Sequence, residues 1–94
     1  MKTCGGSELG EIIKRHYSLS FDVETFREWN HSEKGELISY ETHFERDGKK
    51  DVIVEKLING LTEKVYLNGE EVAGQGNKSP YCVAEEKMVE TWRQ

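Results

Sequence analysis

Residues 36–74, ELISYETHFERDGKKDVIVEKLINGLTEKVYLNGEEVAG, decide the fold of this chain. Three dipeptides, Asp47-Gly48, Asn59-Gly60 and Asn68-Gly69, interrupt runs in which apolar and polar residues alternate. Tight hairpin turns favour Asn-Gly and Asp-Gly, because both central positions take a left-handed backbone conformation. The segment therefore predicts a continuous antiparallel meander.

The turns also predict which residues face one another across the strands. A two-residue turn at the second dipeptide places Val54 opposite Val65, and the third dipeptide places Val65 opposite Val72. At the first dipeptide, continuity of the apolar face favours a three-residue loop, Arg46-Asp47-Gly48, which pairs Tyr40 with Val54. The apolar residues of one side form the predicted core face: Tyr17, Leu19, Phe21, Val23, Ile38, Tyr40, Phe44, Val52, Val54, Ile58, Leu61, Val65, Leu67 and Val72.

The flanks of the meander predict one more strand and two helices. Apolar residues recur at helical spacing over residues 8–16, and alternation over residues 17–24 predicts a strand that ends near Thr25-Phe26. Ser79-Pro80 is a helix-start signal, and it is followed by apolar residues at helical spacing up to Trp92. We predict a single α+β domain over residues 1–94, with residues 1–6 as a loose terminus, a short N-terminal helix, a five-stranded meander and a C-terminal helix.

This predicted layout resembles the cystatin-like or the hot-dog style of α+β architecture. In that arrangement a long twisted antiparallel sheet holds the first helix in its concave face. The resemblance implies a fold, and it implies no activity or site residue.

Composition restricts the partners and the compartment. Thirteen Lys and Arg against eighteen Asp and Glu give a net charge of −5, which argues against nucleic acid as the main partner. The sequence has no apolar run of the length that a signal peptide or a membrane span requires. Its two cysteines, Cys4 and Cys82, are predicted to be free thiols, and the protein is predicted to be cytoplasmic.

The residues that could carry chemistry do not form a recognisable catalytic or metal motif. His16, His31 and His43 lack metal-ligand spacing, so we predict no metal site and no cofactor. Glu41, His43 and Glu45 alternate on one polar strand face, which offers the groups of acid–base catalysis but also matches the solvated side of an ordinary sheet. The second interpretation is the commoner one, and we predict that the protein is not an enzyme.

Three apolar side chains on the predicted outer face would be exposed to water unless another element packs on them. Ile53, Leu57 and Tyr66 project away from the predicted core, with Ile53 opposite Tyr66. Either the C-terminal helix, through Tyr81, Met88 and Trp92, or a second chain covers them, and a homodimer is one form of the latter.

The leading functional prediction is a small acidic protein-binding module that acts as an inhibitor or regulator, as phage- or plasmid-encoded inhibitors and immunity proteins do. Its expected partner is a protein with a basic surface, bound through Glu41, Glu45, Glu55, Tyr66 and Trp92. The alternative is a small enzyme or ligand-binding protein with a pocket between the sheet and the N-terminal helix, using His43 or His16 with Glu41.

Overall fold

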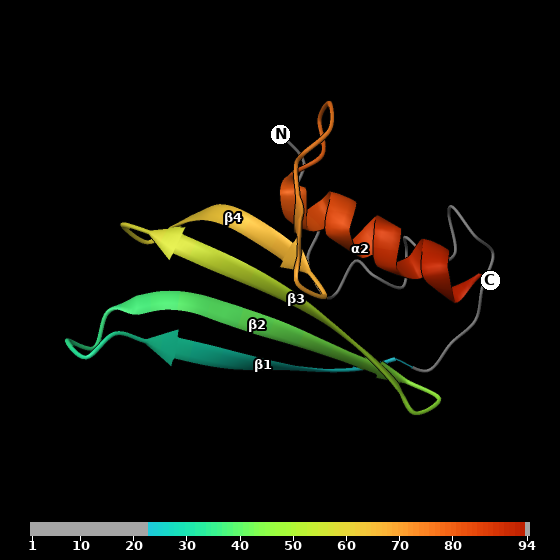
Figure 1. The fold of residues 1–94 in the computed structure, drawn as a ribbon, viewed down its shortest axis with the longest axis horizontal. Coiled ribbons are helices and arrows are strands. Elements are labelled where there is room, and N and C mark those ends of the chain that lie inside the picture. The colour runs from blue at the N-terminus through green and yellow to red at the C-terminus, as the bar shows by residue number, and fades with distance from the viewer. Residues whose placement is uncertain (1–22, 94) are drawn as a thin grey trace.

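The computed structural model describes residues 23–93 as a five-stranded antiparallel sheet followed by one helix (Figure 1). The predicted N-terminal helix and residues 17–22 of the predicted first strand lie outside the described residues. The sheet order is β1-β2-β3-β4-β5, which confirms the meander. The elements are β1 (Glu24–His31), β2 (Leu37–Arg46), β3 (Lys49–Ile58), β4 (Leu61–Leu67), β5 (Glu70–Val72) and α2 (Pro80–Trp92).

The three predicted hairpin turns are all present, and each has two residues. Asp47, Asn59 and Asn68 have φ angles of 47°, 52° and 49°, and the glycine after each also has a positive φ. Left-handed conformations at both central positions match the right-handed twist of the flanking strands. The predicted three-residue loop at Arg46-Asp47-Gly48 is therefore wrong, because Arg46 pairs directly with Lys49.

A bulge between β3 and β4 changes the predicted register. Lys56 pairs with Lys64 but Leu57 pairs with Thr62, so Glu63 has no partner across the ladder. The prediction that places Val54 opposite Val65 is wrong: Val54 faces Tyr66 and Val65 faces Glu55. The predicted pairing of Val65 with Val72 is confirmed.

The register decides which side of each strand is buried. Phe44, Ile53, Val65 and Val72 point to α2 and form one cluster with its residues Tyr81, Val83, Ala84, Met88, Val89 and Trp92. Ile53, predicted on the outer face, is fully buried in this core. Val52 and Val54, predicted in the core, lie half-buried on the opposite side of β3. Ile38, Ile58 and Leu61, also predicted in the core, are exposed.

Within the described residues, β1 begins where the predicted first strand ends. Alternation breaks near Thr25-Phe26, yet β1 runs through these residues and ends at His31. Its ladder to β2 pairs Glu24 with Glu45 and Glu28 with Glu41. Val23, at the start of this segment, packs against the core cluster.

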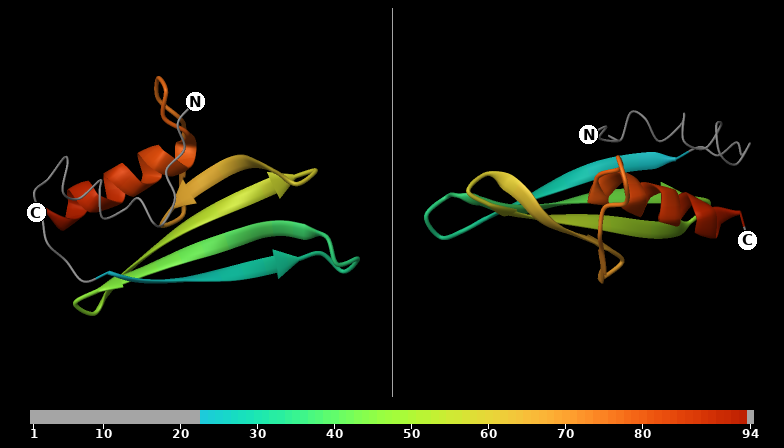
Figure 2. Two further views of the ribbon diagram at one scale, coloured as in Figure 1. Left: turned by 180° about the vertical axis from the view of Figure 1, so that it is seen from behind. Right: turned by 90° about the horizontal axis from the view of Figure 1, so that it is seen from above.

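The C-terminal helix begins where the sequence predicts. Ser79 is the N-cap, and its hydroxyl accepts a hydrogen bond of 3.2 Å from the Cys82 amide, while Pro80 occupies the first turn. The helix packs on β3, β4 and β5. Figures 1 and 2 show that the turns joining β1 to β2 and β3 to β4 extend away from the helix.

Cys82 corrects a prediction about redox state. Its sulfur is disulfide-bonded, so the predicted pair of free thiols is wrong. Within residues 23–93, no helix has the length and apolar character needed to cross a membrane.

Candidate functional site

The candidate site lies on the side of the sheet away from α2. We call this side the far face; on β1 and β2 it carries Glu24, Phe26, Glu28, Asn30, Ser39, Glu41, His43 and Glu45, and on β3 and β4 it carries Lys50, Val52, Val54, Lys56, Lys64 and Tyr66. Because successive side chains in a strand alternate between faces, these residues share one surface while the core residues occupy the other.

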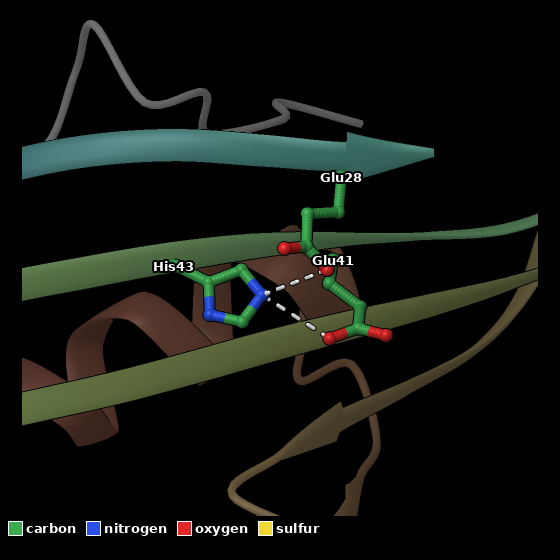
Figure 3. Close-up of side chains that lie close together, drawn as sticks. All are labelled: Glu28, Glu41 and His43. Atoms are coloured by element: carbon green, nitrogen blue, oxygen red, sulfur yellow. Dashed lines mark hydrogen bonds and ion pairs between the residues drawn. The ribbon is translucent and has the colours of Figure 1, made fainter. Parts of the chain in front are cut away.

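Glu28, Glu41 and His43 meet at the centre of β1 and β2 (Figure 3). The Nε2 atom of His43 lies 3.2 Å from Oε1 of Glu41 and 3.8 Å from Oε2 of Glu28. Glu28 and Glu41 are directly opposite in the ladder, which brings two carboxylates to one imidazole. We call these three residues the Glu-His cluster.

Neighbouring side chains hold the Glu-His cluster in place. The Asn30 amide donates a 3.2 Å hydrogen bond to Oε2 of Glu41 and another of 3.2 Å to the Ser39 hydroxyl. The Phe26 ring stacks on the His43 ring, with centroids 4.5 Å apart and planes 3° from parallel. These contacts orient the imidazole and leave Oε1 of Glu41 facing it.

The Glu-His cluster has donor atoms suited to a divalent cation. Its three candidate ligand atoms lie within 4.8 Å of one another. Imidazole nitrogen and carboxylate oxygen bind Zn²⁺ at about 2.0–2.2 Å, so ligand atoms around one ion lie roughly 3–3.5 Å apart. A small closing movement of Glu28 would bring all three atoms to that spacing. Water would complete the coordination, because the Glu28 side chain is 58% exposed.

The five predicted partner-binding residues do not share one surface. Glu41, Glu45 and Tyr66 lie on the far face, where the Lys56 ammonium sits 5.2 Å from the Tyr66 ring centroid. Glu55 and Trp92 lie on the helix side and are 7% and 5% exposed. The expectation that Glu55 is exposed is therefore wrong, and the bulge at Glu63 together with the two-residue turn before β3 accounts for it.

Glu55 belongs to a partly buried polar group on the helix side of the sheet. The Tyr40 and Thr62 hydroxyls donate to its Oε1 at 3.4 and 3.3 Å. Burial raises the pKa of Glu55, and the nearby Arg27 charge opposes that rise. Burial also raises the pKa of Tyr81, and the Glu85 carboxylate adds to this effect.

Trp92 anchors the helix on the sheet. Its indole Nε1 donates a 3.1 Å hydrogen bond to Oδ2 of Asp51, and the Arg46 guanidinium lies 4.8 Å from the centroid of its ring. A tryptophan held in this way stabilises the fold, and its side chain is buried against the sheet.

An open groove of about 430 Å³ lies near the β3–β4 turn. Its lining is Ile38, Ser39, Lys56, Leu57, Ile58, Glu63 and Lys64. The groove shares no residue with the Glu-His cluster, but Ser39, Lys56 and Lys64 of its lining also belong to the far face.

Comparison with protein-family models, with curated proteins and with solved structures finds no match for this chain.

Sequence reasoning placed Glu41 and His43 on one face but missed three residues beside them. Phe26, Glu28 and Asn30 lie at or beyond the strand end predicted near Thr25-Phe26, although their own alternation, Phe-x-Glu-x-Asn, continues the strand. That period-two pattern was the available signal.

Proposed function

We propose that the protein is a protein-binding module whose far face contacts a basic surface of its partner and thereby inhibits or regulates that partner. The observation that carries the proposal is a pair of like-charged matches across β1 and β2, where Glu24 faces Glu45 and Glu28 faces Glu41. Like charges directly opposite one another destabilise a sheet. A cationic partner would relieve this repulsion.

Neighbouring side chains offset only part of the repulsion. Lys50 is opposite Glu45 on β3, and His43 contacts Glu28 and Glu41. Apolar groups that a partner could cover lie beside these four carboxylates. One of them is Phe26, which is 54% exposed. Charges of this kind mainly raise the association rate and set the orientation, while buried aromatic groups slow dissociation.

The test compares protein capture by matched charge variants. The double variant Glu41→Lys/Glu45→Lys should lose the partner that the wild-type protein captures. The control Glu33→Lys/Glu90→Lys should keep it, because it makes the same change in net charge at exposed positions off the far face. Association of the purified pair should slow as salt increases. Equal capture by both variants would remove the far face from the proposal.

A second candidate function, binding of a divalent cation, is supported by the three converging donors of the Glu-His cluster. Zn²⁺ is one ion that this donor set fits, because it binds both imidazole nitrogen and carboxylate oxygen. Titration with Zn²⁺ should give one saturable site that His43→Gln abolishes and His31→Gln, an exposed control at the end of β1, preserves. Equal binding by both variants would contradict the site.

The catalytic alternative remains a separate prediction. The predicted N-terminal helix lies outside the described residues, and His43 and Glu41 lie on the far face, away from α2. The buried disulfide-bonded Cys82 supports an oxidising compartment over the cytoplasmic location predicted from the sequence, because cytosolic thiols are kept reduced.

A further inference from the structure

The two edges of the sheet differ in length and cover. β5 is a three-residue edge strand beside the helix, and a short edge offers little backbone for pairing. β1 is an eight-residue edge strand in which every residue except Asn30 is exposed. Among residues 23–93 only β2 pairs with it. Its outward N–H and C=O groups form a template for an additional strand.

Pairing of β1 with a second copy of itself is electrostatically unfavourable. A two-fold axis normal to the sheet places residues of the same face opposite each other. Antiparallel pairing along the whole strand then centres on Arg27 or on Glu28, so one of these charges meets its own copy. Two chains of net charge −5 also repel one another.

We infer that the β1 edge accepts an extended segment of a basic partner as an additional antiparallel strand. The inference rests on the proposed function, and it specifies how the partner reaches Glu24, Glu28, Glu41 and Glu45 on the far face. On the far face, Glu24, Phe26 and Glu28 would lie beside the added strand. The best cross-strand neighbours of the two glutamates are basic side chains, and the best neighbour of Phe26 is an apolar side chain, so these three types should occupy alternate positions of the added strand.

The helix side of β1 completes the chemistry of this segment. Thr25, Arg27 and Trp29 alternate there, and Trp29 is 55% exposed. Their best cross-strand neighbours are a β-branched side chain for Thr25, an acidic one for Arg27 and an apolar one for Trp29. The predicted ligand is therefore a strand with basic residues four positions apart, an apolar residue midway between them, and one acidic residue on its other face.

A synthetic peptide of this pattern, Thr-Val-Lys-Glu-Val-Thr-Lys, is the probe. Its lysines lie opposite Glu28 and Glu24 when it runs antiparallel to β1. The full chain is titrated with the peptide and monitored by NMR. Two further peptides carry N-methyl groups, one on its second and fourth residues and the other on its third and fifth, without changing side-chain charge.

Strand addition predicts different behaviour for the two methylated peptides. Successive N–H groups of a strand point to opposite edges, so one peptide should lose affinity by about tenfold or more and the other should bind as the parent does. Equal binding of all three would overturn the edge inference and leave contact through the far face intact. Failure of the parent peptide to bind would also overturn the edge inference, while capture by the charge variants would still decide the proposed function.

A charge swap tests the chemistry of the segment. Glu28→Lys should weaken binding of the parent peptide by about fivefold, and a peptide with Glu at its third position should recover it. Circular dichroism would check that the variant is folded. Binding that ignores the swap would overturn the assignment of a basic segment.

Discussion

Truncation of Ile53 tests the register that separates the core from the far face. Ile53 is fully buried in the cluster with Phe44 and Val65. Ile53→Ala removes three carbon atoms, worth about 2.4 kcal/mol of transfer free energy at roughly 0.8 kcal/mol each. The remaining cavity adds to this, for a total of about 3 kcal/mol. In a domain of this size that loss lowers Tm by about 12–24 °C.

Val54→Ala is the matched control, because Val54 is the next residue along β3 and is half-buried on the far face. It removes two carbon atoms that remain partly in contact with water, so its cost should be about 1 kcal/mol. Thermal and denaturant unfolding of both variants, with the disulfide intact, measures the difference. A larger loss for Val54→Ala than for Ile53→Ala would refute the register and restore the one predicted from the turns alone.

Three other perturbations have defined outcomes. Burial raises the pKa of the Glu55 carboxyl group above its usual 4.5, so the folded protein binds the carboxyl proton more tightly than the unfolded chain does. This proton binding contributes its full stabilisation at pH values below 4.5, and the stabilisation is lost as the pH rises through the pKa of the folded state. Unfolding free energies of Glu55→Gln should therefore fall less than those of the wild type from about pH 4 to about pH 7, and identical slopes would contradict this. Gly60, with a φ of 80°, should not tolerate a β-branched side chain, so Gly60→Val should cost on the order of 1–3 kcal/mol in denaturant unfolding, whereas a change within error would show that the turn relaxes. Because Cys82 is disulfide-bonded, an alkylating reagent should modify neither of the two cysteines when the protein is unfolded without reduction. The same reagent should modify both cysteines after reduction. Modification without reduction would contradict the disulfide bond.

The parts of the fold that were predicted correctly depend on short-range interactions. An Asn-Gly or Asp-Gly pair adopts the left-handed turn almost by itself, and all three such turns are present. Ser79-Pro80 likewise begins a helix through a hydrogen bond to an amide three residues away. The layout of a meander followed by a helix could therefore be predicted from the residues alone.

The errors arose where local choices were equivalent and distant contacts decided between them. Both faces of β3 carry apolar residues, Val52 and Val54 on one and Ile53 and Leu57 on the other, so the alternation does not say which face is buried. The face of β3 that carries Ile53 is the one buried against α2. The bulge at Glu63 turns Val65 of β4 to the same side of the sheet as Ile53. A shift of one residue then moves every side chain of the strand to the other face.

The candidate site divides in the same way. The sequence by itself determined that Glu41 and His43 share a strand face, because residues two apart in a strand point in the same direction. Only the tertiary structure decided that Glu28 joins them and that Glu55 and Trp92 turn inward, because cross-strand register and the packing of α2 on the sheet depend on residues far apart in the chain.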